Sequence, residues 1–271
     1  MNTKSLSCLA AALLISASRS FAAATGQTAD VTEVVNEVLY GPDGSSETRP
    51  AHVDTQLPDG SYLKTGTQSR AELRLPSTSV TRIGANTIFN FSAESNTLDL
   101  QSGTILFCKP KESPRKLNVK TAAVTAGIVG TTGFVQVTGQ GSAKTYRFGL
   151  VEGKAYAEAN GKTFLVHGGE VLEFTPGSTP RLYPFDVPNF VHSSPLFRGF
   201  KGHLPNEKYI DEAIANYLDD ERRGFVGSTG GGSTRSFGNG TPGIPVSSVD
   251  SVQNARQGEQ PGQSHSYPSG G

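Results

Sequence analysis

The central part of the chain contains short segments in which apolar and polar residues alternate. In the segment 70–75, Ala71, Leu73 and Leu75 fall on one side of an extended strand, and the charged residues between them fall on the other. Because side chains on a strand alternate between two faces, this pattern predicts a sheet with one buried face. Similar runs recur as far as residue 174, so we expect an all-β domain.

Glycine spacing indicates how these strands are arranged. Gly66, Gly84 and Gly103 are spaced 18 and 19 residues apart, and each interval holds a strand or two and a turn. Such spacing is typical of stacked β-coils, so we predict a solenoid-like, twisted β-coil domain over residues 25–175. The predicted strands are 31–40, 71–75, 79–83, 87–91, 97–100, 104–108, one beginning near 117, 121–125, 134–138, 144–151, 155–159, 163–166 and 171–174.

One turn carries a specific signal. Asn160 and Gly161 lie between two predicted strands, and both residues tolerate the positive φ of a type I′ turn. We therefore predict a tight β-hairpin at this point.

Residues 176–226 have a different character. Five prolines between 176 and 195 interrupt any sheet, so we expect an extended segment whose aromatic residues pack on the domain. One amphipathic helix follows, with Asn206 as its cap and Gly224 as its end. We expect this helix to cover the open end of the coil, because an uncapped coil exposes its apolar interior. Residues 227–271 are rich in Gly, Ser, Pro and Gln, which predicts a disordered tail.

The N-terminus has the features of an export signal over residues 1–24. Lys4 precedes an uncharged, largely apolar run from 6 to 17, and small residues follow, with cleavage after Ala22 or Ala24. That run is shorter than the roughly 20 residues that span a bilayer, and no later segment is apolar enough to cross one. We therefore expect no membrane span and an exported protein, periplasmic or secreted.

Charge and cysteine content narrow the functional classes. The chain has 24 basic and 24 acidic residues, and a balance this even argues against nucleic-acid binding. Of the two cysteines, Cys8 lies in the predicted signal, which leaves Cys108 without a disulfide partner. No histidine is near Cys108 in sequence, so we interpret it as a half-buried packing residue and not as a nucleophile.

We identify no catalytic residue, no metal ligand set and no cofactor site. The five histidines are scattered, and the acidic residues of the predicted strands show no repeated spacing that would stack them. The chain is therefore predicted not to be an enzyme, and the alternative is a secreted carbohydrate-active enzyme on a β-solenoid. The candidate contact residues are the basic Lys109, Lys111, Arg115 and Lys116. They are suited to bind an anionic surface, and an ordinary solvent-exposed loop accounts for this run of charges equally well.

Several short motifs between residues 31 and 174 resemble the FecR-type domain family. They are Leu63-Lys64-Thr65-Gly66, the strand 69–75, Arg82-Ile83-Gly84-Ala85-Asn86-Thr87, the segment 98–103, Val119-Lys120-Thr121, Val129-Gly130-Thr131-Thr132, the strand 134–137, the segment 151–155 and Gly168-Gly169-Glu170. One position departs from the family pattern, because Val129 stands where members often carry arginine.

The resemblance implies an all-β, solenoid-like extracytoplasmic domain without catalytic residues. The family's namesake relays the state of an outer-membrane receptor to a cytoplasmic sigma factor, which requires a transmembrane helix and an anti-sigma segment. We expect neither in this chain, so only the module is implied. The leading hypothesis is an exported, non-catalytic interaction module that binds an envelope protein or an anionic glycan. The further alternatives are a structural surface protein and an accessory to FecR-like envelope signalling.

Overall fold

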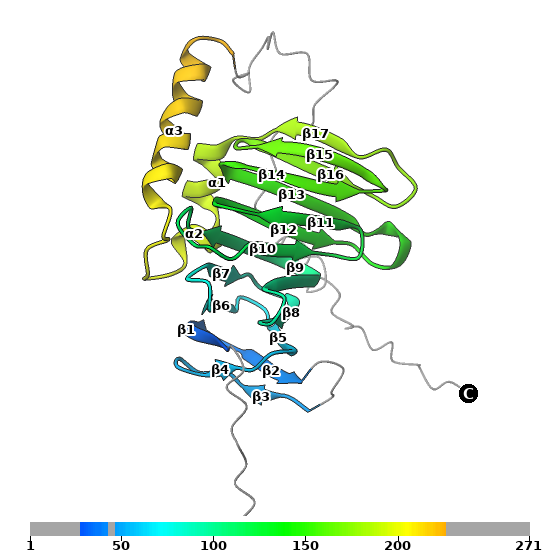
Figure 1. Cartoon of the computed structure of the whole chain (residues 1–271), viewed down its shortest axis with the longest axis vertical. Coiled ribbons are helices and arrows are strands. Elements are labelled where there is room, and N and C mark those ends of the chain that lie inside the picture. The colour runs from blue at the N-terminus through cyan, green and yellow to red at the C-terminus, as the bar shows by residue number, and fades with distance from the viewer. Residues whose placement is uncertain (1–27, 43–46, 226–271) are drawn as a thin grey trace, which may run out of the picture.

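The computed structural model describes residues 28–42 and 47–225. The predicted signal peptide at 1–24 and the predicted disordered tail at 227–271 lie outside these residues. Within them, the chain forms strands and one short 3-10 helix (Gly141–Ala143) up to residue 184, and α-helices after it (Figure 1). None of the described helices is both long enough and apolar enough to cross a bilayer.

The strands form two packed sheets, here named sheet A and sheet B. In order across sheet A the strands are β4 (Gln56–Leu57), β1 (Ala29–Val35), β6 (Arg70–Arg74), β7 (Val80–Ile83), β9 (Thr97–Lys109), β12 (Thr131–Thr138), β13 (Thr145–Glu152), β16 (Glu170–Phe174) and β17 (Arg181–Pro184). In order across sheet B they are β3 (Arg49–Pro50), β2 (Val38–Pro42), β5 (Ser61–Thr65), β8 (Ile88–Ser92), β9, β10 (Leu117–Lys120), β11 (Val124–Ile128), β14 (Lys154–Ala159) and β15 (Lys162–His167).

Strand β9 belongs to both sheets. Its first half pairs with β8 and β10, and its second half pairs with β7 and β12. The strand passes from one sheet to the other at Gly103, which has a φ of 90°. Gly103 also lies against Thr87, and a Cβ atom on residue 103 would clash with the Thr87 hydroxyl. Glycine is required at this bend. The sequence predicted two separate strands here, at 97–100 and 104–108, and that division was wrong.

The predicted all-β architecture is confirmed, but the stacked-coil arrangement is not. Strands pair as antiparallel hairpins, such as β6–β7 and β12–β13 in sheet A and β10–β11 and β14–β15 in sheet B. Among the described strands only β9 and β10 pair in parallel, and the sheet is open. The regular glycine spacing instead reflects the places where the chain passes from one sheet to the other. At one of them, the Thr65 hydroxyl donates to the Gly84 carbonyl at 2.6 Å, and the Gly84 N–H donates to the Thr104 carbonyl at 2.9 Å.

The main core lies between the two sheets. Leu73, Ile105 and Phe148 reach it from sheet A, and Leu63 and Phe89 reach it from sheet B, all with 0% of their surface exposed. Burial of this apolar surface is the main force holding the sheets together. The inward face of β6 was predicted correctly, since Ala71, Leu73 and Leu75 are buried.

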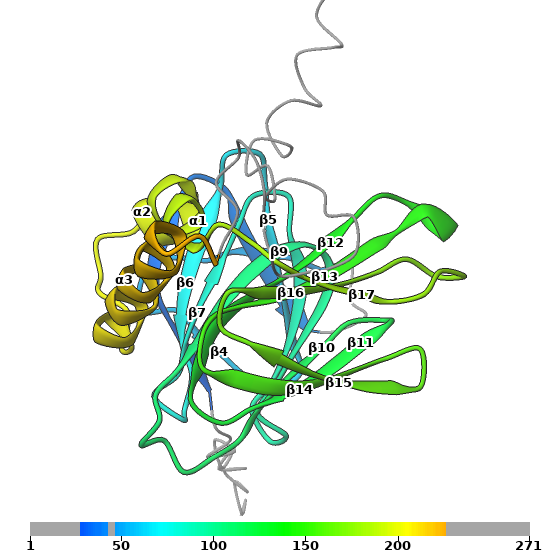
Figure 2. The same cartoon turned by 90° about the horizontal axis from the view of Figure 1, so that it is seen from above.

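A third layer covers the outer face of sheet A (Figure 2). It contains α1 (Val187–Ser193), α2 (Pro195–Arg198) and α3 (Glu207–Arg222). The expectation that the C-terminal helix covers an open end was wrong: it lies along a face, because that face is apolar. The residues of this second core are Val80, Leu106, Cys108, Phe134, Val151 and Val171 of the sheet, and Phe185, Val187, Phe190, Leu196, Leu204 and Ile210 of the covering layer.

The segment before α3 is not simply extended. It contains β17, α1 and α2, and its two helices accommodate Pro188 and Pro195 in their first turns. Proline is compatible with a first turn because the missing N–H would have no partner inside the helix. Its aromatic residues pack on the domain as expected: Phe134 of β12 lies 4.6 Å from Phe190, centroid to centroid.

A buried arginine of sheet A binds α2 and the loop after it. The Arg82 Nε atom lies 2.7 Å from a Glu72 carboxylate oxygen, and their side chains are 2% and 10% exposed. The rest of the guanidinium donates to the carbonyls of Leu196, Phe197 and Gly202. One arginine on β7 therefore satisfies three backbone carbonyls of α2 and the loop after it.

Candidate functional site

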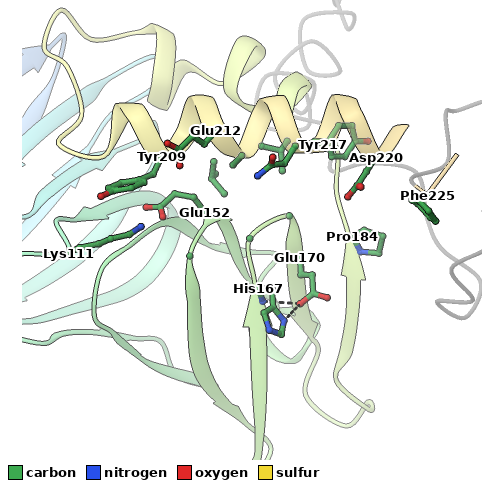
Figure 3. A pocket seen from close by; sticks show the side chains of 17 residues that line it. Lys111, Glu152, His167, Glu170, Pro184, Tyr209, Glu212, Tyr217, Asp220 and Phe225 are labelled. Carbon is green, nitrogen blue, oxygen red and sulfur yellow. Dashed lines mark hydrogen bonds and ion pairs between the residues drawn. The ribbon is translucent and has the colours of Figure 1, made fainter. Parts of the chain in front are cut away.

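A cavity of about 500 Å³ lies between α3 and two turns at the edge of the sheets (Figure 3). The turns are those between β13 and β14 and between β15 and β16. We name this cavity the α3 groove. The lining residues used below are Lys111, Glu152, His167, Glu170, Tyr209, Glu212, Asn216, Tyr217 and Asp220.

Backbone hydrogen bonds place the two turns side by side. The Gly168 N–H donates to the Gly153 carbonyl at 2.8 Å, and the Gly169 N–H donates to the Leu150 carbonyl at 2.7 Å. Gly153 and Gly169 both have positive φ, at 84° and 83°. Glycine adopts this conformation without the steric cost that other residues meet, so the turns stay tight and leave room for α3.

A buried polar cluster joins the start of α3 to sheet A. The Asn206 side-chain amide donates to Glu152 Oε1 at 2.8 Å, to the Lys109 carbonyl at 2.9 Å and to Thr132 Oγ1 at 3.2 Å. Asn206 and Glu152 are 2% and 5% exposed. Asn206 is the N-cap residue of α3, as predicted, but its side chain makes no capping hydrogen bond and is directed at the sheet.

Burial controls the protonation of Glu152. Desolvation raises the pKa of this carboxyl above its usual range, and hydrogen bonds from Thr132 and Asn206 and the charge of Lys111 act in the opposite direction. Glu152 therefore combines a structural contact with a place in the groove wall.

The groove is acidic and has aromatic walls. Four carboxylates and one ammonium among its lining residues give it a formal charge of −3 when His167 is neutral. The Lys111 ammonium lies 3.3 Å from the centroid of the Tyr209 ring, a cation–π contact. Burial, with Asp186 and Glu221 nearby, raises the pKa of Tyr217 to about 12, so its phenol stays neutral. This surface suits a cationic group that can also pack on an aromatic ring.

His167 and Glu170 form the other polar pair of the groove. The Glu170 carboxylate accepts from the His167 backbone N–H at 2.9 Å and lies 3.3 Å from its Nδ1. The His167 side chain is 56% exposed. In the described part of the chain, no group of three or more His, Cys, Asp or Glu residues is arranged to hold a metal ion.

The four basic residues proposed as partner contacts do not form one patch. Lys109 is buried, and its ammonium donates to the carbonyls of Ser113 at 2.7 Å and Pro110 at 3.3 Å, while burial lowers its pKa. Arg115 donates to the carbonyls of Ala93 and Glu94. Lys116 is exposed and lies over Gly127. Among these four, only Lys111 lines the α3 groove, and a role in contacting a partner stays a prediction.

Cys108 is more buried than the sequence suggested. Its side chain is 0% exposed, and its sulfur accepts from the Thr132 hydroxyl at 3.3 Å. Burial raises the pKa of the thiol to about 11, which keeps it protonated and unreactive at neutral pH.

Some residues of the groove could be recognised from the sequence. Tyr209 and Tyr217 lie within the predicted amphipathic helix, and Glu152-Gly153 and Gly168-Gly169-Glu170 belong to the motifs that resemble the FecR family. The hydrogen bond between Glu152 and Asn206 could not be predicted from the sequence, because 54 residues separate the two. The polar residue at the helix start was a signal, but it is equally compatible with a cap.

Comparison with known proteins identifies the domain. Residues 61–156, from β5 into β14, match the family model described as FecR protein. This matched segment is similar to a FecR domain. The segment supplies strands to both sheets and includes Lys111 and Glu152 of the groove, whereas α3 lies outside the matched residues. No curated protein matches the chain.

Two solved structures match part of this chain, and both are described as candidate anti-sigma factors from Parabacteroides distasonis ATCC 8503. The first is 12% identical with a TM-score of 0.43, and the match covers 49% of this chain and 64% of that one. The second is 10% identical with a TM-score of 0.41, and the match covers 51% of this chain and 74% of that one. This chain thus spans somewhat less than two thirds of the first structure.

Proposed function

We propose that this protein is an exported, non-catalytic interaction module of the bacterial envelope, whose FecR domain and helical layer together bind another envelope protein. The observation that carries this proposal is the FecR family match over residues 61–156. The N-terminal segment supports export, because it has a charged start, an apolar run and small residues at its end.

The α3 groove is the proposed contact surface. Its carboxylates and tyrosine rings favour a protein segment that presents lysine or arginine, since such side chains pair with carboxylates and stack on aromatic faces. The same charge disfavours an anionic glycan at this place. The basic residues that would have served a glycan are separated, and one of them is buried.

The contacts of the groove residues support binding over catalysis. Glu152 accepts a hydrogen bond from Asn206, and Lys111 lies against Tyr209, so both side chains help to hold α3 in place. A partner that docks here would contact a preformed surface, which lowers the entropic cost of binding.

Site-specific photo-crosslinking in the native bacterium tests the proposal. A photoreactive residue replaces Asn216, which is exposed and lines the groove, or Tyr156, which is 65% exposed on sheet B and serves as the matched control. We expect a protein adduct from position 216 and none from position 156. Fractionation and mass spectrometry of the same cells should find the chain outside the cytoplasm, cleaved after Ala22 or Ala24.

Each part of the proposal has its own contrary outcome. An uncleaved chain in the cytoplasm would refute export. Equal adducts from both positions, or none from position 216, would refute the groove as the contact surface.

A further inference from the structure

A second cavity, of about 410 Å³, lies on the outer face of sheet A under α1 and α2. It is separate from the α3 groove, and the two share no lining residue. We name it the Arg70 cavity. Its floor is a row across four neighbouring strands, formed by Arg70 of β6, Gly84 after β7, Thr104 of β9 and Gln136 of β12.

The cavity exists because the middle of this row has small residues. Gly84 has no side chain, and Ala85 beside it has only a methyl group. Phe134, Phe190 and Leu196 supply the apolar walls. Three strand spacings of about 4.8 Å separate β6 from β12, so the polar ends of the row lie roughly 14 Å apart.

The cavity has one formal charge, which is positive. No aspartate or glutamate is among its lining residues, and Arg70 is the cationic one. The Arg70 Nε atom is buried and has no hydrogen-bond partner within the described residues. Arg82 and Arg147 on the same sheet differ, because their Nε atoms each bind a carboxylate at 2.7 Å. The Nε atom is packed against Gly199, but Arg70 as a whole is half-buried and lines the cavity. A guanidinium that lines a cavity without a carboxylate in its walls favours an anion.

The opposite end of the row is polar and neutral. Gln136 accepts from the Arg147 guanidinium at 3.0 Å through its oxygen, which turns its amide nitrogen to Thr104 Oγ1 at 3.3 Å. This end presents hydroxyl and amide groups without a net charge. A ligand that spans the cavity therefore meets a cation, then apolar walls, then neutral hydrogen-bonding groups.

We propose that the Arg70 cavity binds a small, elongated organic acid. Its carboxylate would lie at Arg70, its aromatic or aliphatic body against Phe134 and Phe190, and a neutral polar group near Gln136. The cavity volume is within the usual range for small-molecule sites, about 300–1,000 Å³. This inference goes beyond the proposed function, and neither depends on the other.

Calorimetric titration of the full chain with three matched probes tests the charge requirement. The probes are 3-(4-hydroxyphenyl)propanoate, the corresponding propanamide and 4-hydroxyphenethylamine. We expect saturable binding of the acid, with the amide and the amine at least about tenfold weaker, because the charge-assisted contact is lost. No saturable binding of the acid up to millimolar concentration, or equal binding of the amide, would overturn the proposal without any variant.

Two variants locate the site. Arg70→Gln should weaken binding of the acid at least about tenfold, to the level of the amide, while Arg74→Gln should change it less than about twofold. Arg74 is the matched control, because it lies on the same strand, is exposed and does not line the cavity.

Ala85→Leu keeps Arg70 but fills the cavity, so it should abolish binding of the acid. Near-ultraviolet circular dichroism confirms that each variant is folded. Unchanged acid binding in a folded Ala85→Leu or Arg70→Gln chain would contradict the assignment.

Discussion

Two charged side chains of this protein, those of Lys109 and Glu152, are almost fully buried. Lys109 ends β9 and Glu152 ends β13, and both are at most 5% exposed. The Asn206 amide contacts the Lys109 carbonyl and the Glu152 carboxylate, so one polar side chain connects both strand ends to α3. Burial shifts the two pKa values in opposite directions, because desolvation disfavours each charged form.

Replacement of Glu152 by glutamine should not destabilise the protein at neutral pH. Burial raises the pKa of Glu152 in the folded chain above the ordinary 4.5 of the unfolded chain. At pH values between these two pKa values, the folded chain binds more protons than the unfolded chain. The free energy of unfolding therefore falls as the pH rises through this range. Glutamine keeps an oxygen for Asn206 and carries no charge. We expect Glu152→Gln to raise the free energy of unfolding at pH 7 by on the order of 1 kcal/mol.

Urea denaturation between pH 4 and pH 8 measures this effect. The difference between variant and parent should shrink as pH falls toward 4.5, where the parent also becomes protonated. Glu212→Gln, an exposed change in the same groove, should alter stability by less than about 0.5 kcal/mol at any pH. A Glu152→Gln chain that is less stable than the parent at pH 7 would show that the ionised carboxylate is needed.

At the scale of elements, alternation and turn chemistry predicted most of the strands. The Asn160-Gly161 hairpin is confirmed, with φ of 51° and 68° at its two residues. The first predicted strand, 31–40, is instead the two strands β1 and β2, separated at Asn36 with a φ of 59°. An asparagine in this conformation gives no clear signal within a run of apolar residues.

The helical layer was harder to predict for a physical reason. Prolines suggested an irregular segment, but Pro188 and Pro195 lie in first turns, where proline does not disrupt a helix.

Sheet A was also expected to bury one face, and it buries both, since Glu72 on its outer side is 7% exposed. Alternation shows that a strand has two faces, but not what covers the polar one.

Arg82 should determine how firmly α2 is held on the sheet. Arg82→Lys keeps the charge beside Glu72 but cannot reach the carbonyls of Leu196, Phe197 and Gly202 with one compact ammonium. We expect a loss of about 2–4 kcal/mol in the free energy of unfolding. Hydrogen exchange should accelerate in residues 196–202 and stay unchanged in β5 and β8.

Arg147→Lys is the comparison for this experiment. Arg147 also pairs with a carboxylate at 2.7 Å on sheet A, but its side chain is 24% exposed and its hydrogen bonds go to Glu173 and Gln136, both of sheet A. Its replacement should cost less than about 1 kcal/mol. Similar losses for both variants would show that the carbonyl contacts of Arg82 do not hold α2.

At the scale of the whole molecule, the FecR match and the folded unit do not coincide. The match spans residues 61–156 and includes Leu106, Phe134 and Val151 on the outer face of sheet A. The residues that cover this face, among them Phe190 and Ile210, follow the match in sequence. The helical layer therefore completes the second core and belongs to the same folded unit as the matched segment.

A chain ending at Pro184 should consequently be unstable. It keeps every strand of both sheets but exposes the apolar outer face of sheet A, which Phe190, Leu196 and Ile210 otherwise bury. Loss of such contacts costs about 2–5 kcal/mol for each large side chain, which approaches the whole stability of a typical domain. We expect aggregation or strong binding of a hydrophobic dye. A chain ending at Phe225 retains the layer and should melt within a few degrees of the full chain. A soluble chain ending at Pro184 with an unchanged melting temperature would mean that the two sheets alone make the folded unit, since their shared core would then suffice without the outer one.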